Sequence, residues 1–127
     1  MQIGTQANNE ARLLEPVLTG FQELAEELGM DDEIRNDLLR SFLDRCREFL
    51  NLLSDSISNR DQEKFERTTH SLKGLSGNMR FHKLGDLNEQ FTQAYHDDDL
   101  QKAGQVLSDM GEEYHRIQDA ITDLIGK

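Results

Sequence analysis

The sequence predicts an all-α fold: an antiparallel four-helix bundle with an additional N-terminal helix packed across one end. Apolar residues recur at intervals of three and four along most of the chain, as buried helical stripes require. Charged residues make up 31% and hydrophobic residues 35% of the 127 residues, with one proline and no tryptophan, which is typical of a helical protein. No segment reads as a strand.

The N-terminal part combines a polar segment with a first helix. Residues 1–9 are expected to form a flexible tail, and residues 10–127 a single domain. We expect a first helix that ends at Gly29; Pro16 leaves two starts open, one before Leu13 and one near Glu15 with the proline in the first turn. Its apolar positions are Leu13, Leu14, Val17, Leu18, Phe21, Leu24 and Leu28.

The second and third helices follow after short turns. Asp31 or Asp32 is predicted to cap the second helix. Its stripe comprises Ile34, Leu38, Phe42, Cys46, Phe49, Leu53 and Ile57. Residues 59–61 supply the next turn, and the third helix is expected to end near residues 78–80.

The last two helices have regular patterns. The fourth carries Phe81, Leu84, Leu87, Phe91 and Ala94. Residues 96–99 end it and cap the fifth. The stripe of the fifth consists of Leu100, Ala103, Leu107, Met110, Tyr114, Ile117, Ile121 and Leu124. This narrow seam is typical of helices in antiparallel bundles.

The chain is strongly acidic. Asp and Glu number 25 against 14 Lys and Arg, so the formal net charge is −11. Such a surface repels phosphate backbones and anionic lipid, which argues against nucleic-acid or membrane binding. The single cysteine, Cys46, is expected to be buried, and its lack of a partner fits a reducing compartment. With no signal peptide and no membrane span, we expect a cytoplasmic protein. We expect a monomer, because packing inside the bundle is enough to explain the regular last helix.

Positive charge is concentrated in one window. Residues 60–83 hold six basic residues against three acidic ones, a net charge of +3 centred near His70. The basic residues are Arg60, Lys64, Arg67, Lys73, Arg80 and Lys83. We interpret this window as a docking zone for an acidic partner, although exposed charges often lack any specific role.

His70 has unusual neighbours. At about 100° per residue, it falls on the side of the third helix opposite the apolar stripe, so its ring is expected to face water. The residues predicted to surround it are Glu63, Glu66, Arg67, Lys73, Gly74 and Gly77. A glycine inside a helix costs about 1 kcal/mol relative to alanine. Two of them on this face suggest that side chains are cleared for the approach of another surface.

The chemistry available to such a histidine is nucleophilic. An exposed imidazole is mostly neutral at cytoplasmic pH, so one ring nitrogen has a free lone pair that can attack phosphorus. Lys73, one turn away, would place a positive charge beside a phosphoryl group on His70. Glu66 could accept a hydrogen bond from the other ring nitrogen, or be an ordinary exposed helix residue.

The stretch His-Ser-Leu-Lys-Gly-Leu-Ser-Gly-Asn, residues 70–78, with Leu84 downstream, resembles the histidine-containing phosphotransfer (HPt) domain of phosphorelays. The motif His-x-Leu-Lys-Gly-x-Ser is fairly specific for that family, and the order of helices agrees over nearly the whole chain. The resemblance implies that His70 is the phosphoacceptor, that Lys73 stabilises the phosphoryl group and that Gly74 allows a partner to approach.

Further residues are expected to contact the partner: Arg67, Ser71, Gly77, Arg80 and His82. The family usually has a small residue, often glycine, where this chain has Arg80, which puts the turn after the third helix in doubt. Family members often place a glutamine near the histidine. Gln90 and Gln93 are candidates, but neither is in register, so the role is not assigned.

The implied function is to accept a phosphoryl group on His70 from a receiver-domain aspartate and to relay it to another receiver. The partners would be response-regulator receiver domains and a hybrid sensor kinase. The chain has no glycine-rich phosphate loop, so we expect a modified carrier without ATP binding or kinase activity. It would need no cofactor of its own, because the receiver supplies Mg²⁺.

Two alternatives remain. A helical bundle could bind metal, with His96 beside Asp97, Asp98 and Asp99, but such sites use inward-facing Glu-x-x-His pairs on several helices, which this chain lacks. An HPt-like adaptor could instead bind receiver or kinase domains by shape without being phosphorylated.

Overall fold

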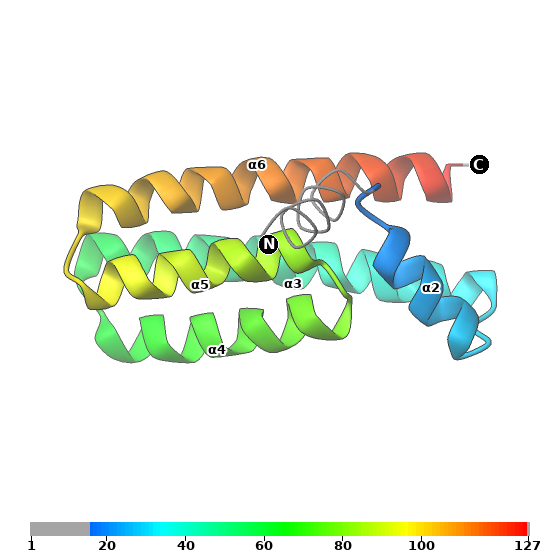
Figure 1. Ribbon diagram of the computed structural model, residues 1–127, viewed down its shortest axis with the longest axis horizontal. Coiled ribbons are helices and arrows are strands. Elements are labelled where there is room, and N and C mark those ends of the chain that lie inside the picture. The colour runs from blue at the N-terminus through cyan, green and yellow to red at the C-terminus, as the bar shows by residue number, and fades with distance from the viewer. Residues whose placement is uncertain (1–15, 127) are drawn as a thin grey trace, which may run out of the picture.

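The computed structural model describes residues 16–126, and every regular element in that range is a helix. The helices are α2 (Thr19–Glu27), α3 (Asp32–Asn59), α4 (Gln62–Asn78), α5 (His82–His96) and α6 (Leu100–Ile125). Both α3 and α5 pack against α4 and α6, so α4 and α6 occupy opposite corners of a bundle, with α2 across one end (Figure 1). The predicted fold is therefore confirmed. The expected tail, Leu13, Leu14 and Glu15 lie outside the described residues.

Three aspartates define the helix starts. The side chain of Asp31 accepts a hydrogen bond from the Ile34 backbone N–H at 2.8 Å. Asp61 and Asp99 cap α4 and α6 through equivalent bonds of 3.0 and 3.1 Å. Each cap satisfies a backbone donor that has no partner inside its helix. The predicted turns at 59–61 and 96–99 are confirmed.

Aromatic rings occupy both ends of the bundle interior. Phe65 of α4 stacks on Tyr95 of α5, with ring centroids 3.7 Å apart. Phe42 of α3 meets the edge of Phe81, in the α4–α5 turn, at 4.6 Å. Cys46 is fully buried as predicted, and burial raises the pKa of its thiol to about 12. None of the described helices is long and apolar enough to cross a membrane.

The first helix begins later than predicted. The Thr19 N–H donates to the Pro16 carbonyl at 3.0 Å, which forms a turn, and α2 starts only at Thr19. Its end agrees with the prediction, because Gly29 adopts φ +65° after the last turn. Proline therefore lies before the helix rather than inside it, which avoids any conflict with the helical hydrogen bonds.

The start of α3 also differs from the prediction. Ile34 and Leu38 are 51% and 38% exposed, whereas Leu39, absent from the predicted stripe, is fully buried. Since Phe42 lies level with Phe81 in the α4–α5 turn, residues 32–41 extend past that turn. Leu28, before α3, is likewise 65% exposed. Ile34 and Leu38 follow the predicted helical period but remain exposed, whereas Leu39 joins the core cluster.

Candidate functional site

His70 lies on the outer face of α4. Phe65 and Leu72 on the same helix are fully buried, and Thr69, directly before His70, is 5% exposed. His70 itself is exposed. The predicted orientation is confirmed, because the 3.6-residue period that buries one side of α4 places the imidazole on the other.

Two glycines on this face pack against nothing. A Cβ added at Gly74 or Gly77 would meet no atom of residues 16–126 within 4 Å, and both positions are exposed. Gly85 of α5 differs, because a Cβ there would lie 3.3 Å from the Ser76 hydroxyl. Packing in the described part of the chain explains the glycine at 85 but not those at 74 and 77. Their effect is to leave the surface beside His70 without side chains.

Lys73 is exposed and lies three residues after His70, and its ammonium group forms no ion pair within residues 16–126, whereas Arg67, three residues before His70, pairs with Glu63. A phosphoryl group one turn away would therefore not compete with an existing carboxylate. Lysine provides a mobile positive charge suited to phosphate. The geometry supports the expected role of Lys73 without showing it.

Most of the predicted basic docking zone is neutralised inside the molecule. The ion pairs are Arg60–Asp98 at 2.7 Å, Arg67–Glu63 at 4.0 Å, Arg80–Glu27 at 3.0 Å and Lys83–Glu113 at 3.8 Å. Three of the four acidic partners lie outside the window 60–83, so a count of charges within it could not reveal them. Docking of an acidic partner on this window stays a prediction, but four of its six basic residues already have an acidic partner in the described structure.

Glu66 has partners other than His70. Its Oε1 lies 3.0 Å from His96 Nε2 and accepts a hydrogen bond from Gln62 Nε2 at 2.8 Å. His96 also presents its ring to Phe65 edge-on, at 5.3 Å between centroids. The carboxylate is thus directed toward the C-terminal end of α5. Sequence gave no signal for this pair, because His96 is 30 residues away.

Arg80 forms the turn between α4 and α5. Its backbone has φ +58°, the left-handed region that glycine adopts without strain. This conformation explains why a small residue suits the position. Its guanidinium contacts both carboxylate oxygens of Glu27 at 3.0 and 3.3 Å, and this hydrogen bonding raises the pKa of Arg80. Arg80 therefore reaches toward α2, and its predicted contact with a partner stays a prediction.

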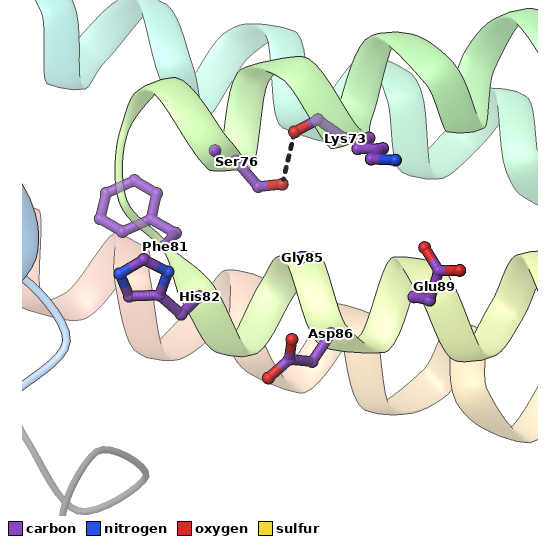
Figure 2. A pocket seen from close by; sticks show the side chains of 8 residues that line it. Lys73, Ser76, Phe81, His82, Gly85, Asp86 and Glu89 are labelled. Carbon is purple, nitrogen blue, oxygen red and sulfur yellow. Dashed lines mark hydrogen bonds between the residues drawn. The ribbon is translucent and has the colours of Figure 1, made fainter. Parts of the chain in front are cut away.

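A groove of about 320 Å³ lies between α4 and α5 (Figure 2). We call it the α4–α5 groove; its walls are Lys73, Ser76, Gly77, Phe81, His82, Gly85, Asp86 and Glu89. Asp86 and Glu89 form no ion pair in the described part of the chain, and both are exposed. Sequence reasoning identified His82 at this surface but missed the two carboxylates, whose only signal is their i, i+3 spacing on α5.

The remaining predicted residues are dispersed. Arg67 is exposed and Ser71 half-buried, both on α4 near His70. Gln90 and Gln93 are exposed, and the Gln93 amide donates to Asp97 at 3.0 Å. The α5 amide that reaches α4 belongs instead to Asn88.

No group of three or more His, Cys, Asp or Glu side chains that could hold a metal is found within residues 16–126. His96, placed beside three aspartates in the sequence, is paired with Glu66 in the structure.

Comparison with known families agrees with this geometry. The Hpt domain family matches residues 37–126, a range that contains α4 and most of the bundle. No curated protein and no solved structure matches the chain significantly. The match covers well over half of the chain and includes His70, Lys73 and both open glycines. The chain belongs to the Hpt domain family, whose members are phosphocarriers of two-component signalling that act with receiver domains.

Proposed function

We propose that His70 accepts a phosphoryl group from the aspartyl phosphate of one receiver domain and passes it to the aspartate of another. A ring nitrogen attacks phosphorus, the new N–P bond forms as the P–O bond to the aspartate breaks, and the carboxylate leaves. The reverse sequence delivers the group onward. The observation that supports this role is an exposed histidine one turn from an unpaired lysine, on a face opened by two glycines.

Few protein groups are needed for this transfer. Phosphoryl transfer requires positioning and neutralisation of charge rather than covalent assistance. Lys73 would supply the cation on this chain, and Mg²⁺ bound by the receiver would supply the rest. The carrier would need neither ATP nor a metal of its own.

The α4–α5 groove would receive part of the docking surface. Phe81, in the α4–α5 turn, lines one end of the groove, and its α5 side carries the unpaired carboxylates of Asp86 and Glu89 (Figure 2). An aliphatic stem can contact the apolar lining while its charged head meets the carboxylates. The groove therefore favours a basic side chain on the receiver, contrary to the acidic partner expected from the sequence.

The direct test is transfer of ³²P from phosphorylated receiver domains of the same genome to the purified chain. The wild-type protein should acquire acid-labile, base-stable label, and His70→Gln should acquire none. Label retained in His70→Gln would place the acceptor elsewhere. Binding of receivers without any label on the wild-type protein would instead support a non-phosphorylated adaptor.

A further inference from the structure

Asn88 joins α5 to the backbone of the phosphoacceptor helix. Its side chain is 3% exposed, and its Nδ2 donates a hydrogen bond to the Thr69 carbonyl at 2.9 Å. That carbonyl belongs to the peptide unit between Thr69 and His70. The bond is therefore a buried cross-link placed directly behind the predicted acceptor.

Burying the Asn88 side chain has an energetic cost. Asn88 Oδ1 is buried and has no hydrogen-bond partner among residues 16–126. A buried acceptor without a partner costs about 1–3 kcal/mol, about as much as a hydrogen bond returns. A leucine of similar size would fill the same space without this penalty. Stability alone therefore gives little reason for an asparagine at this position.

The bond acts at the centre of the reacting turn. In an α-helix the Thr69 carbonyl also accepts the N–H of Lys73, four residues later. His70 follows that carbonyl and Lys73 provides its helical donor, so one peptide unit influences the direction of both side chains. A second donor from α5 fixes this peptide unit, and thereby the rotation of α4 about its axis.

A second contact along the same seam supports this view. Gly85, three residues before Asn88, leaves room for Ser76, whose hydroxyl would lie 3.3 Å from a Cβ at 85. The Ser76 hydroxyl in turn donates to the Leu72 carbonyl at 2.8 Å. The two helices are thus held by close contact near Ser76 and by a directional bond near His70. Close packing sets their separation, whereas the directional bond sets the rotation.

We propose that Asn88 is a positioning residue for phosphoryl transfer, which keeps His70 and Lys73 in register through the Thr69 carbonyl. The proposal rests on the proposed function of His70. Asn88 does not touch the phosphoryl group, and its contribution is to keep the acceptor nitrogen and the ammonium group directed at the same phosphorus.

The first test uses Asn88→Leu, with Asn88→Ala as a second variant in case leucine disturbs the fold. Thr92→Val is the matched control, because the Thr92 hydroxyl donates to the Asn88 carbonyl within α5 at 2.8 Å and no hydrogen bond from it to α4 is found among the described residues. Single-turnover transfer is measured over a range of receiver concentrations. We expect the saturating rate to fall about tenfold in the Asn88 variants, with the half-saturating concentration and the melting temperature nearly unchanged. Thr92→Val should transfer like the wild type.

The second test needs no receiver. Phosphoramidate phosphorylates histidine directly, breaking its P–N bond and releasing ammonia. If Asn88 acts through the register of His70 with Lys73, Asn88→Leu and Lys73→Ala should each slow labelling of His70, and the double variant should be no slower than the worse single one. Additive losses, or unchanged labelling in Asn88→Leu, would overturn the positioning role. Failure of every receiver to label the wild type would reject the proposed function while this cycle still decides the role of Asn88.

Discussion

We expect the glycine at position 74 to lower the stability of the folded protein while leaving space for a receiver to reach His70. It lies inside α4, one turn after His70, and a Cβ there would meet no atom of the described structure within 4 Å. Replacing a helical glycine with a residue of good helix propensity gains up to about 1 kcal/mol. Gly74→Gln should therefore raise the free energy of unfolding by about 0.5–1 kcal/mol and the melting temperature by about 2–4 °C.

The same change should impair transfer. A glutamine at 74 projects from the face that carries His70 and occupies the space a receiver needs. We expect the rate at subsaturating receiver to fall about tenfold, which corresponds to about 1.4 kcal/mol. Quenched-flow labelling from a phosphorylated receiver measures this transfer rate. Urea unfolding monitored by circular dichroism measures the free energy of unfolding.

Gly104 provides the matched control. It lies inside α6 and is exposed, and a Cβ added there would likewise meet no atom within 4 Å in the part of the chain that the structure describes. Because α6 occupies the corner of the bundle opposite α4 (Figure 1), Gly104→Gln should gain the same stability and transfer like the wild type. Equal transfer in the two variants would refute the argument that Gly74 clears a docking face. A loss of stability in Gly74→Gln would show that the position is not open.

Four further changes test other parts of the molecule. His70→Gln should lose all label while melting within about 2 °C of the wild type, because an exposed side chain contributes little to stability; a large destabilisation would contradict its placement. Gly20→Ala would bring a Cβ to 2.9 Å from the Arg80 Cβ and 3.0 Å from its carbonyl oxygen, so urea unfolding should show a loss of about 1–3 kcal/mol, with partial recovery when combined with Arg80→Gly. An unchanged free energy of unfolding would mean that α2 is loosely packed against Arg80 at Gly20. Burial raises the pKa of Cys46 from 9.0 to about 12, so the unfolded state ionises first; stability relative to Cys46→Val should fall as pH rises from about 9 toward 12, and a flat difference would argue against burial of the thiol. Glu89→Lys should raise the half-saturating concentration of a receiver about threefold, equal to about 0.6 kcal/mol, and an unchanged value would separate the α4–α5 groove from docking.

The elements that sequence predicted well are those set by local chemistry. The starts of α3, α4 and α6 follow from aspartate caps, which act within three residues of the chain. The outward direction of His70 follows from the period of one helix. Neither prediction requires knowing which helices pack against each other.

The failures arise where distant parts of the chain meet. Leu38 and Leu39 are adjacent and both apolar, yet Leu39 joins the core cluster and is fully buried whereas Leu38 is 38% exposed. Asn88 gave no signal at all, because its role depends on a carbonyl 19 residues away. Helical period alone cannot say where a neighbouring helix ends or which carbonyl it presents.

Arg80 shows how an unusual residue is accommodated. The sequence showed that Arg80 stands where the family usually has a small residue, but not how the fold accommodates the larger side chain. The left-handed backbone of a non-glycine residue is unfavourable by about 1–2 kcal/mol. Here Gly20 yields space to the Arg80 side chain, and Glu27 binds its guanidinium, so α2 supplies both adjustments. The substitution is tied to the helix that crosses the end of the bundle.

The distribution of charge also bears on how a carrier works. A group that is accepted and then given away must not be held too strongly, because stabilising the phosphorylated form raises the barrier to the next transfer. One unpaired lysine beside His70 meets this requirement better than the six-residue basic zone suggested by the sequence, most of which is paired elsewhere. Recognition can then rest partly on other residues, the carboxylates of Asp86 and Glu89 in the α4–α5 groove. Lys73 lines the same groove, so it is the one described residue through which affinity for the receiver and affinity for the phosphoryl group are coupled.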